Sequence, residues 1–247
     1  MTNWNEVHIY LFFFLFISLL KCSLCIDCYS PLGQFAGQIL PSSYSCLGAS
    51  FYLPNTDNIC CSYETVPAPT NIKNITKYEF FKSIFENSGD EKRTEYLYAW
   101  TDAALQLVLS YTERAEWCRV KSGFLAILAA ETNGYQTFDS NTFTYPYKPR
   151  GILRSTNQTS YHTLYQITMF DYSKLPEKLV FISDAISSTG RFWNKHRDLA
   201  GQLSFGFLSS FQWVTETINN MNGMGSTVSW EEKKRRFELA TKVLKCI

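Results

Sequence analysis

The placement of eight cysteines is the feature that most constrains this chain of 247 residues. Four of them fall within residues 28–61, in the pattern C-x17-C-x13-CC, among Gly, Pro, Ser and Asn residues. A segment this short and irregular cannot bury a core of its own and depends on its cross-links. We therefore expect either a small stapled module or a disulfide-tied arm that lies on a larger domain.

The N-terminus carries an apolar run, residues 9–20, that reads IYLFFFLFISLL. A helix of this length is too short to cross a bilayer core of ~30 Å, but it matches the apolar region of a secretory signal. Cleavage after Cys25 removes two cysteines and starts the mature chain at Ile26. We expect residues 1–25 to be a signal peptide and the mature protein to be secreted, extracellular, without a membrane span, and monomeric.

The six remaining cysteines form an even set, which in a secreted protein predicts disulfides. They are Cys28, Cys46, Cys60, Cys61, Cys118 and Cys246. Six cysteines allow 15 pairings, so the connectivity of the N-terminal four stays open. The other two, Cys118 and Cys246, are the only ones beyond that cluster, and we expect them to pair with each other.

Charge and motif content exclude several classes of function. The chain has 23 Lys+Arg against 22 Asp+Glu, a formal net charge of +1, which does not fit a nucleic-acid binder. Its three histidines are scattered, so no zinc-ligand spacing exists, and it has no phosphate-binding glycine loop. We expect neither a metal nor an organic cofactor.

Composition divides the mature chain into three parts. Residues 26–62 form the cysteine-rich module, and residues 63–77, with two prolines, are typical of a linker. Residues 78–247 form the main domain. Two sequons, at Asn74 and Asn157, predict N-glycosylation on the secretory route.

Apolar residues recur at helical spacing through most of the main domain. One stripe runs from Trp100 to Tyr111, a second helix covers about 116–131, and a third carries the stripe from Ile182 to Trp193. Ser229 with Glu232 has the spacing of a capping box and opens a last helix. Residues 135–161 lack a helical stripe and predict a loop with a short hairpin. The fold class is therefore mainly α with a small irregular or β insert.

A glutamate interrupts the second of these stripes. At 100° per residue, Glu131 lies between Val120 and Phe124 on the apolar face, in the last turn before a plausible Asn133-Gly134 C-cap. Apolar neighbours and the negative end of the helix dipole both disfavour a charged carboxylate there, which is the requirement for a general acid. The alternative is a partly buried glutamate paired with Arg or Lys from elsewhere, or one that points outward where the helix frays.

Four segments, in order over about residues 98–245, resemble the family 19 chitinases, which are lysozyme-like glycoside hydrolases. The family's F-L-A-Q-x-x-H-E-[ST]-x-G is similar to residues 124–134, and its Y-x-G-R-G-P-I-Q-L-[ST]-x-x-x-N-Y is similar to residues 147–161. Its N-P-x-L-V and A-x-W-F-W elements resemble residues 175–180 and 185–193, and its [VI]-T-x-x-I-N-G-G resembles residues 214–220. The resemblance implies a lysozyme-like α+β hydrolase domain.

The resemblance also implies roles for individual residues. Glu131 matches the catalytic acid, Thr156 and Asn219 match residues that position water and substrate, and Asp139 is the candidate for the second carboxylate that an inverting enzyme needs. The positions that match the substrate-binding motif are Asn133, Tyr147, Arg150, Arg154 and Tyr161. Where the family has Gln and His, this chain has Arg154 and Ala130. The run EEKKRR, residues 231–236, predicts the solvated face of the last helix, and the resemblance implies that its arginines also pair between helices.

These observations lead to three functional hypotheses. The first is a secreted enzyme that cleaves β-1,4-linked N-acetylglucosamine polymers with inversion, using Glu131 as acid and Asp139 as base. The second is a catalytically impaired chitinase-like protein that binds chitin-type glycans, which the departures at Ala130 and Arg154 favour. The third is a lysozyme-like peptidoglycan hydrolase. The sequence does not separate the substrates of the first and third.

Overall fold

The computed structural model describes residues 27–246, with gaps at 45, 47, 54, 87–88, 137, 140–148, 157 and 222–227. The expected signal peptide, Tyr147 and the sequon residue Asn157 lie outside the described residues. Mainly helical structure with one small antiparallel sheet makes up the described chain. Among the described residues, none of the helices is both long and apolar enough to cross a bilayer.

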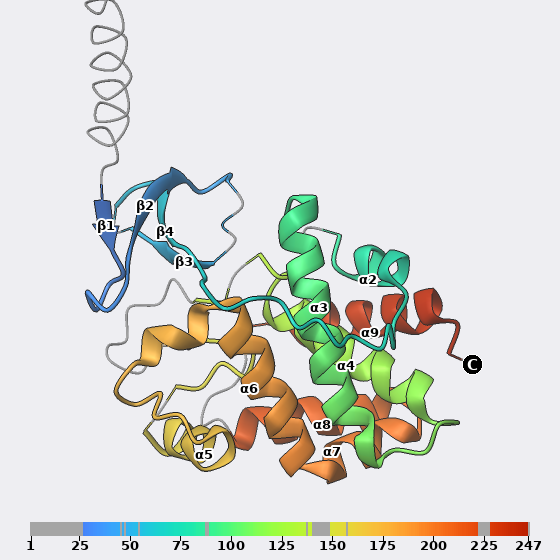
Figure 1. The fold of residues 1–247 in the computed structure, drawn as a ribbon. Helices are drawn as coiled ribbons and strands as arrows, with labels where there is room; N and C mark the ends of the chain where they lie inside the picture. The colour runs from blue at the N-terminus through green and yellow to red at the C-terminus, as the bar shows by residue number, and fades with distance from the viewer. Residues whose placement is uncertain are drawn as a thin grey trace, which may run out of the picture.

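The cysteine-rich segment forms a four-stranded antiparallel sheet in the order β1-β2-β4-β3 (Figure 1). Its strands are β1 (Asp27–Tyr29), β2 (Ala36–Pro41), β3 (Ala49–Tyr52) and β4 (Asn58–Ser62). The sequence predicted a disulfide-stapled module or arm here and gave no signal of its strands. The strands are short, and the adjacent pair Cys60-Cys61 hides the alternation that marks a strand.

Each disulfide of the sheet lies on a different face. Successive side chains on a strand point to opposite sides, so Cys60 and Cys61 on β4 face apart. Cys60 binds Cys28 and Cys61 binds Cys46. These two bonds close the module internally, and the pair predicted by elimination, Cys118–Cys246, is also present.

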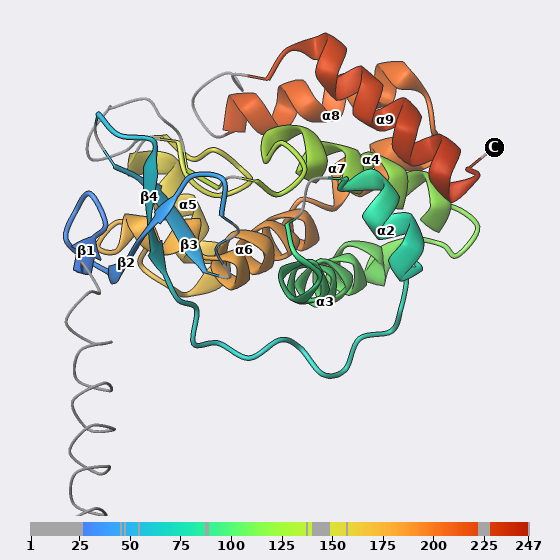
Figure 2. The same cartoon turned by 90° about the horizontal axis from the view of Figure 1, so that it is seen from above.

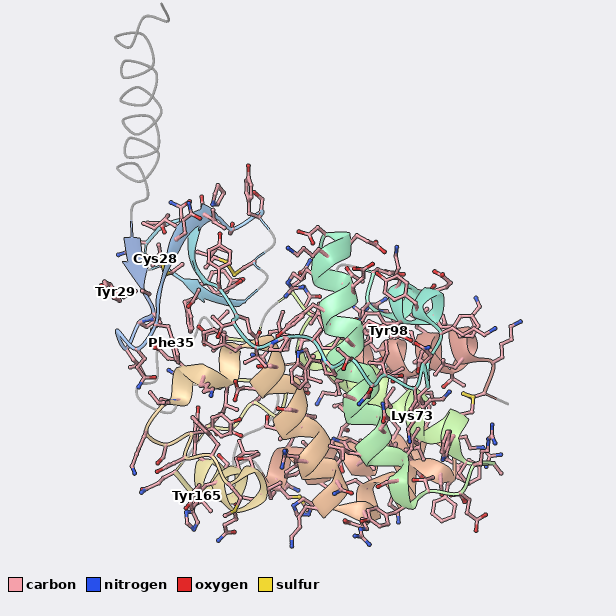
Figure 3. All side chains as sticks on the ribbon, viewed as in Figure 1. Cys28, Tyr29, Phe35, Lys73, Tyr98 and Tyr165 are labelled. Carbon is pink, nitrogen blue, oxygen red and sulfur yellow. A yellow bond between two sulfur atoms is a disulfide. The ribbon has the colours of Figure 1, made fainter. Side chains whose placement is uncertain are left out.

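The inner face of the sheet packs on the helical part through apolar side chains. Ala49, Phe51 and Cys60 are almost fully buried and belong to the same hydrophobic cluster as the helices. Ring contacts join Phe35 and Phe51 to Phe181, with centroids 4.7 and 6.5 Å apart. Figure 3 shows Phe35 at the edge of the sheet that is nearest to the helices.

Residues 63–77 contain neither a helix nor a strand, and they cross helix α3 (Glu91–Val108) on their way from β4 to residue 78, as Figure 1 shows. The buried carboxylate of Asp102 on α3 accepts hydrogen bonds from the backbone N–H groups of Lys73 (2.8 Å) and Ile75 (2.6 Å). The hydroxyl of Tyr98 donates to the carbonyl of Thr76 at 2.7 Å. The side chains of α3 therefore hold this segment in place.

The helices follow in chain order from residue 78. Besides α3 they are α2 (Tyr78–Ile84), α4 (Trp117–Glu131), α5 (Gln158–Thr168), α6 (Ile182–Lys195), α7 (Arg197–Ser204), α8 (Leu208–Met221) and α9 (Trp230–Leu244), with 3-10 turns η1 (Leu109–Tyr111) and η2 (Pro176–Val180). The three predicted stripes fall on α3, α4 and α6, and Ser229 caps α9 by accepting from the N–H of Glu232. Helix α5 begins inside the stretch predicted as a loop, so that boundary was wrong.

Helix α4 is the most deeply buried element. Its residues from Ser122 to Glu131 are all buried, and it contacts α2, α7 and α9 (Figure 2). Phe124 meets Trp193 of α6 edge-on, with ring centroids 5.3 Å apart. The Cys118–Cys246 disulfide ties the start of α4 to the chain just after α9. Both ends of α4 are thus held by α9 or its flanking residues, and this places Glu131 in the interior.

Candidate functional site

Glu131 is the last residue of α4, and the backbone after it explains why the helix stops there. Gly134 N–H donates to the carbonyl of Ala129 (2.8 Å), and Asn133 N–H donates to the carbonyl of Ala130 (3.3 Å). This is the Schellman pattern, in which the residue after the cap adopts a left-handed conformation. Asn133, with φ 48°, is that residue. The predicted Asn133-Gly134 C-cap is confirmed.

The side chain of Glu131 is buried and forms an ion pair. Its Oε1 lies 2.9 Å from Nζ of Lys233 on α9, and the two side chains are only 8% and 6% exposed. The structure therefore contains the buried, paired glutamate that the alternative interpretation predicted. A buried pair compensates two charges that would each be costly alone.

The charged run at residues 231–236 predicted a solvated position for Lys233, and this was wrong. Lys233 and Arg236 are buried at 5% and 3% exposure. They lie on the same side of α9 as Phe237 and Ala240, at the helical spacing i, i+3, i+4 and i+7. That spacing was the available signal. The pair that crosses between helices is made by Lys233, whereas Arg236 binds Glu232 of its own helix and the carbonyl of Ile84.

Arg154 approaches Glu131 from a second direction. Its guanidinium donates to the backbone carbonyl of Glu131, from Nε at 3.1 Å and also from Nη2. Burial lowers the pKa of Arg154, while the negative charges of Glu131 and Asp139 raise it. A cation therefore caps the last carbonyl of α4, where the helix dipole is negative. The same cation lies within electrostatic reach of both carboxylates.

Asp139 is brought near this cation by a small antiparallel arrangement. Single bridges pair Asp139 with Arg150 and Arg150 with Ser155, and Gly151 N–H donates to the carbonyl of Phe138 at 2.8 Å. The hairpin expected between 135 and 161 is present in this form. Asp139 and Arg150 are 2% and 1% exposed, and Thr156, next to Ser155, is 9% exposed. Most of the loop that joins the two sides, residues 140–148, lies outside the described residues.

The other predicted residues lie in varied surroundings. Tyr161 on α5 is fully buried, and its hydroxyl accepts from Nη1 of Arg150 at 3.5 Å. Asn219 is half-buried near the end of α8. Asn133 is exposed and donates from Nδ2 to Oε1 of Gln136 at 2.5 Å. Asn74 is exposed, as a glycosylated residue must be, and its side-chain amide lies 3.0 Å from the Tyr98 hydroxyl.

The site is thus a buried group of charges at the end of α4, to which Glu131, Asp139, Arg154 and Lys233 contribute. Within the part of the chain that the structure describes, no group of three or more His, Cys, Asp or Glu side chains could hold a metal ion. Comparisons of the chain with protein-family models and with curated proteins found no match.

Proposed function

We propose that the protein is a chitinase-like glycoside hydrolase that cleaves β-1,4-linked N-acetylglucosamine polymers with inversion. The observation that carries this proposal is that two carboxylates, Glu131 and Asp139, lie close enough to the buried guanidinium of Arg154 for their charges to raise its pKa. Inverting hydrolysis needs two such groups on opposite sides of the scissile bond. The four segments that resemble family 19 chitinases, and the lysozyme-like domain they imply, supply the substrate class.

In the proposed reaction Asp139 takes a proton from water, and the water oxygen bonds to the anomeric carbon. The bond from that carbon to the glycosidic oxygen breaks as Glu131 gives its proton to that oxygen. Lys233 Nζ lies 2.9 Å from Oε1 of Glu131. Thr156 and Asn219 position water and substrate, and Asn133, Tyr147, Arg150, Arg154 and Tyr161 act in substrate binding or in shaping the site. Asp139 then releases its proton to solvent, and Glu131 takes up a proton from solvent.

Product release from an N-acetylglucosamine hexamer tests the proposal. Glu131→Gln is expected to lower kcat at least ~100-fold, because proton donation is lost. Glu238→Gln is the matched control, since Glu238 is exposed on α9. Asp139→Asn is expected to lower kcat to a similar degree. An α-anomer as the first product, observed by NMR, supports inversion, and a β-anomer contradicts the two-carboxylate geometry.

A second candidate function is glycan binding without cleavage. The observation in its favour is the Lys233–Glu131 ion pair, because Lys233 Nζ occupies Oε1 of the carboxylate that would have to donate the proton. Under this alternative the wild type and Glu131→Gln show equal, near-zero turnover, while both retain binding to chitin. That result would refute the enzyme hypothesis.

We also propose that the protein is secreted. Three disulfides fit an oxidising compartment. N-terminal sequencing of the protein secreted by the cells that express it is expected to give Ile26 as the first residue. Glycosidase treatment is expected to lower the mass, and Asn74→Gln is expected to remove the part of that shift that comes from Asn74. A mature chain that begins at Met1 would contradict this assignment.

A further inference from the structure

A pocket lies between the disulfide-rich sheet and the start of the helical part. Its volume is about 240 Å³. Tyr44, Ser50 and Tyr52 line it from the sheet, and Arg93 and Gln136 line it from the helical part. The size is close to the lower end of ordinary ligand sites, so it suits a single small ring.

The alternation of side chains along β3 explains which of its residues face the pocket. On β3, Ala49 and Phe51 point into the core, so Ser50 and Tyr52 point to the opposite face. Tyr52 is 37% exposed, and Tyr44, in the connection after β2, is 62% exposed. Two tyrosine rings and a serine hydroxyl therefore remain accessible at the pocket.

Arg93 joins the two sides of the pocket. Its Nε donates to the carbonyl of Cys46 (2.8 Å) in the sheet module, and its Nη2 donates to the carbonyl of Tyr135 (2.6 Å) after α4. Burial lowers the pKa of Arg93 to about 10, so the group remains a cation at neutral pH. Among the described residues that line this pocket, none is acidic.

The pocket is close to Glu131 along the chain. Gln136, which lines it, follows Glu131 by five residues, a span of at most ~17 Å even if it were fully extended. The hydrogen bonds of the helix cap shorten that span, and Asn133 binds Gln136 directly. A polymer that reaches Glu131 can therefore reach the pocket within a few sugar units.

We propose that this pocket is a distal subsite that binds one N-acetylhexosamine unit of the polysaccharide, an inference that rests on the proposed function. The tyrosine rings offer flat apolar faces to the C–H face of a pyranose, and the hydroxyl of Ser50 and the amide of Gln136 pair with its polar groups. The cation of Arg93 disfavours an ammonium group, so the subsite selects acetylated over deacetylated units. The disulfide-rich sheet thereby extends the substrate site.

Binding of a thio-linked N-acetylglucosamine hexamer, which hydrolases do not cleave, measures the subsite separately from catalysis. Calorimetry on the full chain compares wild type, Tyr44→Ala/Tyr52→Ala and Tyr29→Ala. Tyr29 is the matched control, because it is 63% exposed on β1, does not line the pocket and points away from the helices (Figure 3). The double variant is expected to bind the hexamer at least about tenfold more weakly, with Tyr29→Ala unchanged. A thio-linked hexamer of glucosamine is expected to bind wild type at least about tenfold more weakly than the acetylated one.

The outcomes separate the subsite from the catalytic proposal. If the double variant, with an unchanged unfolding midpoint, binds the acetylated hexamer as wild type does, the subsite is refuted even where the wild type cleaves chitin. Failure of the wild type to bind the hexamer, or equal binding of the glucosamine hexamer, also overturns it. If the double variant loses binding and the wild type shows no turnover, the subsite stands and the catalytic proposal fails.

Discussion

At the scale of single residues, the ion pair between Glu131 and Lys233 is the most consequential contact. Both side chains are almost wholly removed from water. Taking two charges into the interior costs several kcal/mol per ion, so such a pair contributes little net stability when it is intact. Loss of one partner is different, because the other charge stays buried without the compensation that this partner gave. The pair therefore couples the end of α4 to α9 more than it strengthens the fold.

We predict that Lys233→Met lowers the free energy of unfolding by about 3–5 kcal/mol, because Glu131 is left buried without this cation. The double variant Lys233→Met/Glu131→Leu is expected to regain most of the loss. Urea denaturation monitored by circular dichroism measures both. Lys234→Met, at the next position on α9, is the control and should change stability little. Additive losses in the double variant would show that the two charges are not coupled.

At the scale of elements, close packing between α3 and α6 depends on Gly190. A Cβ at this position would lie 2.9 Å from Cβ and 3.0 Å from Cα of Ala104 on α3. The second of these atoms belongs to the backbone and cannot move aside cheaply. Gly190 thus allows the two helices to approach, although glycine is a poor helix former. Gly201 on α7 has no atom within 4 Å of such a Cβ, so it offers a matched comparison.

Gly190→Ala is accordingly expected to destabilise the protein by ~1–3 kcal/mol through overpacking. Gly201→Ala is expected to stabilise it by ~0.5–1 kcal/mol, because alanine restricts the unfolded chain and favours the helix. Chemical denaturation of the two variants beside the wild type gives both values. The same sign of change at both sites would contradict a specific close approach at Gly190.

The first turn of α9 makes a pH-dependent contribution to the stability of the fold. Hydrogen bonds and charge from Arg235 and Arg236 lower the pKa of Glu232 to about 2. A carboxyl whose pKa is depressed on folding stabilises the fold above its unfolded pKa of ~4.5, and this contribution is lost as the pH falls towards 2. Glu232→Gln should therefore lower the unfolding midpoint at pH 7, and the difference from wild type should shrink below pH ~4.5. Thermal unfolding between pH 2 and 7 measures it, with Glu238→Gln as control. A difference that does not vary with pH would contradict this assignment.

At the scale of the whole molecule, the sequence predicts what depends on local pattern. The buried stripe of α4, its end at Asn133-Gly134 and the cap at Ser229 are all short-range signals, and each is confirmed. The Cys118–Cys246 pair followed from elimination. The helix stripe and the two caps were accessible because neighbours along the chain determine them, whereas the Cys118–Cys246 pair joins residues 128 apart in the sequence and followed only from the cysteine count.

What the sequence did not predict depends on contacts between distant segments. The sheet is stabilised by its disulfides and by Phe181, more than 100 residues further along the chain, so its strands have little signal of their own. Helix α5 begins in a polar stretch, where no apolar stripe marks it. The partner of Glu131 is set by how α9 packs on α4, which no local spacing around Glu131 reveals.

The contacts between residues 63–77 and α6 make the stability of the whole molecule depend on pH. Oε1 of Glu64 accepts from the N–H of Ser183 at 2.9 Å, at the start of α6. Asp184 lies beside it and accepts from the Tyr172 hydroxyl at 2.8 Å. Burial raises the pKa of both carboxyls, and the charge of Asp184 raises the pKa of Glu64 further. The chain after the sheet is thus attached to α6 near two carboxyls whose pKa burial raises above the ordinary value.

We predict that the contacts between residues 63–77 and α6 are stabilised in mild acid. A carboxyl with a raised folded pKa binds more protons in the folded state, so its contribution is present below the unfolded pKa of ~4.5 and is lost as the pH rises through the folded pKa. The unfolding midpoint of wild type relative to Glu64→Gln should therefore rise as the pH falls from 7 towards 4.5. Glu79→Gln, at an exposed position on α2, controls for the loss of one carboxylate. Thermal unfolding at a series of pH values decides the matter, because a wild-type advantage that shrinks on acidification would show that the Glu64 carboxylate is favoured in its charged form.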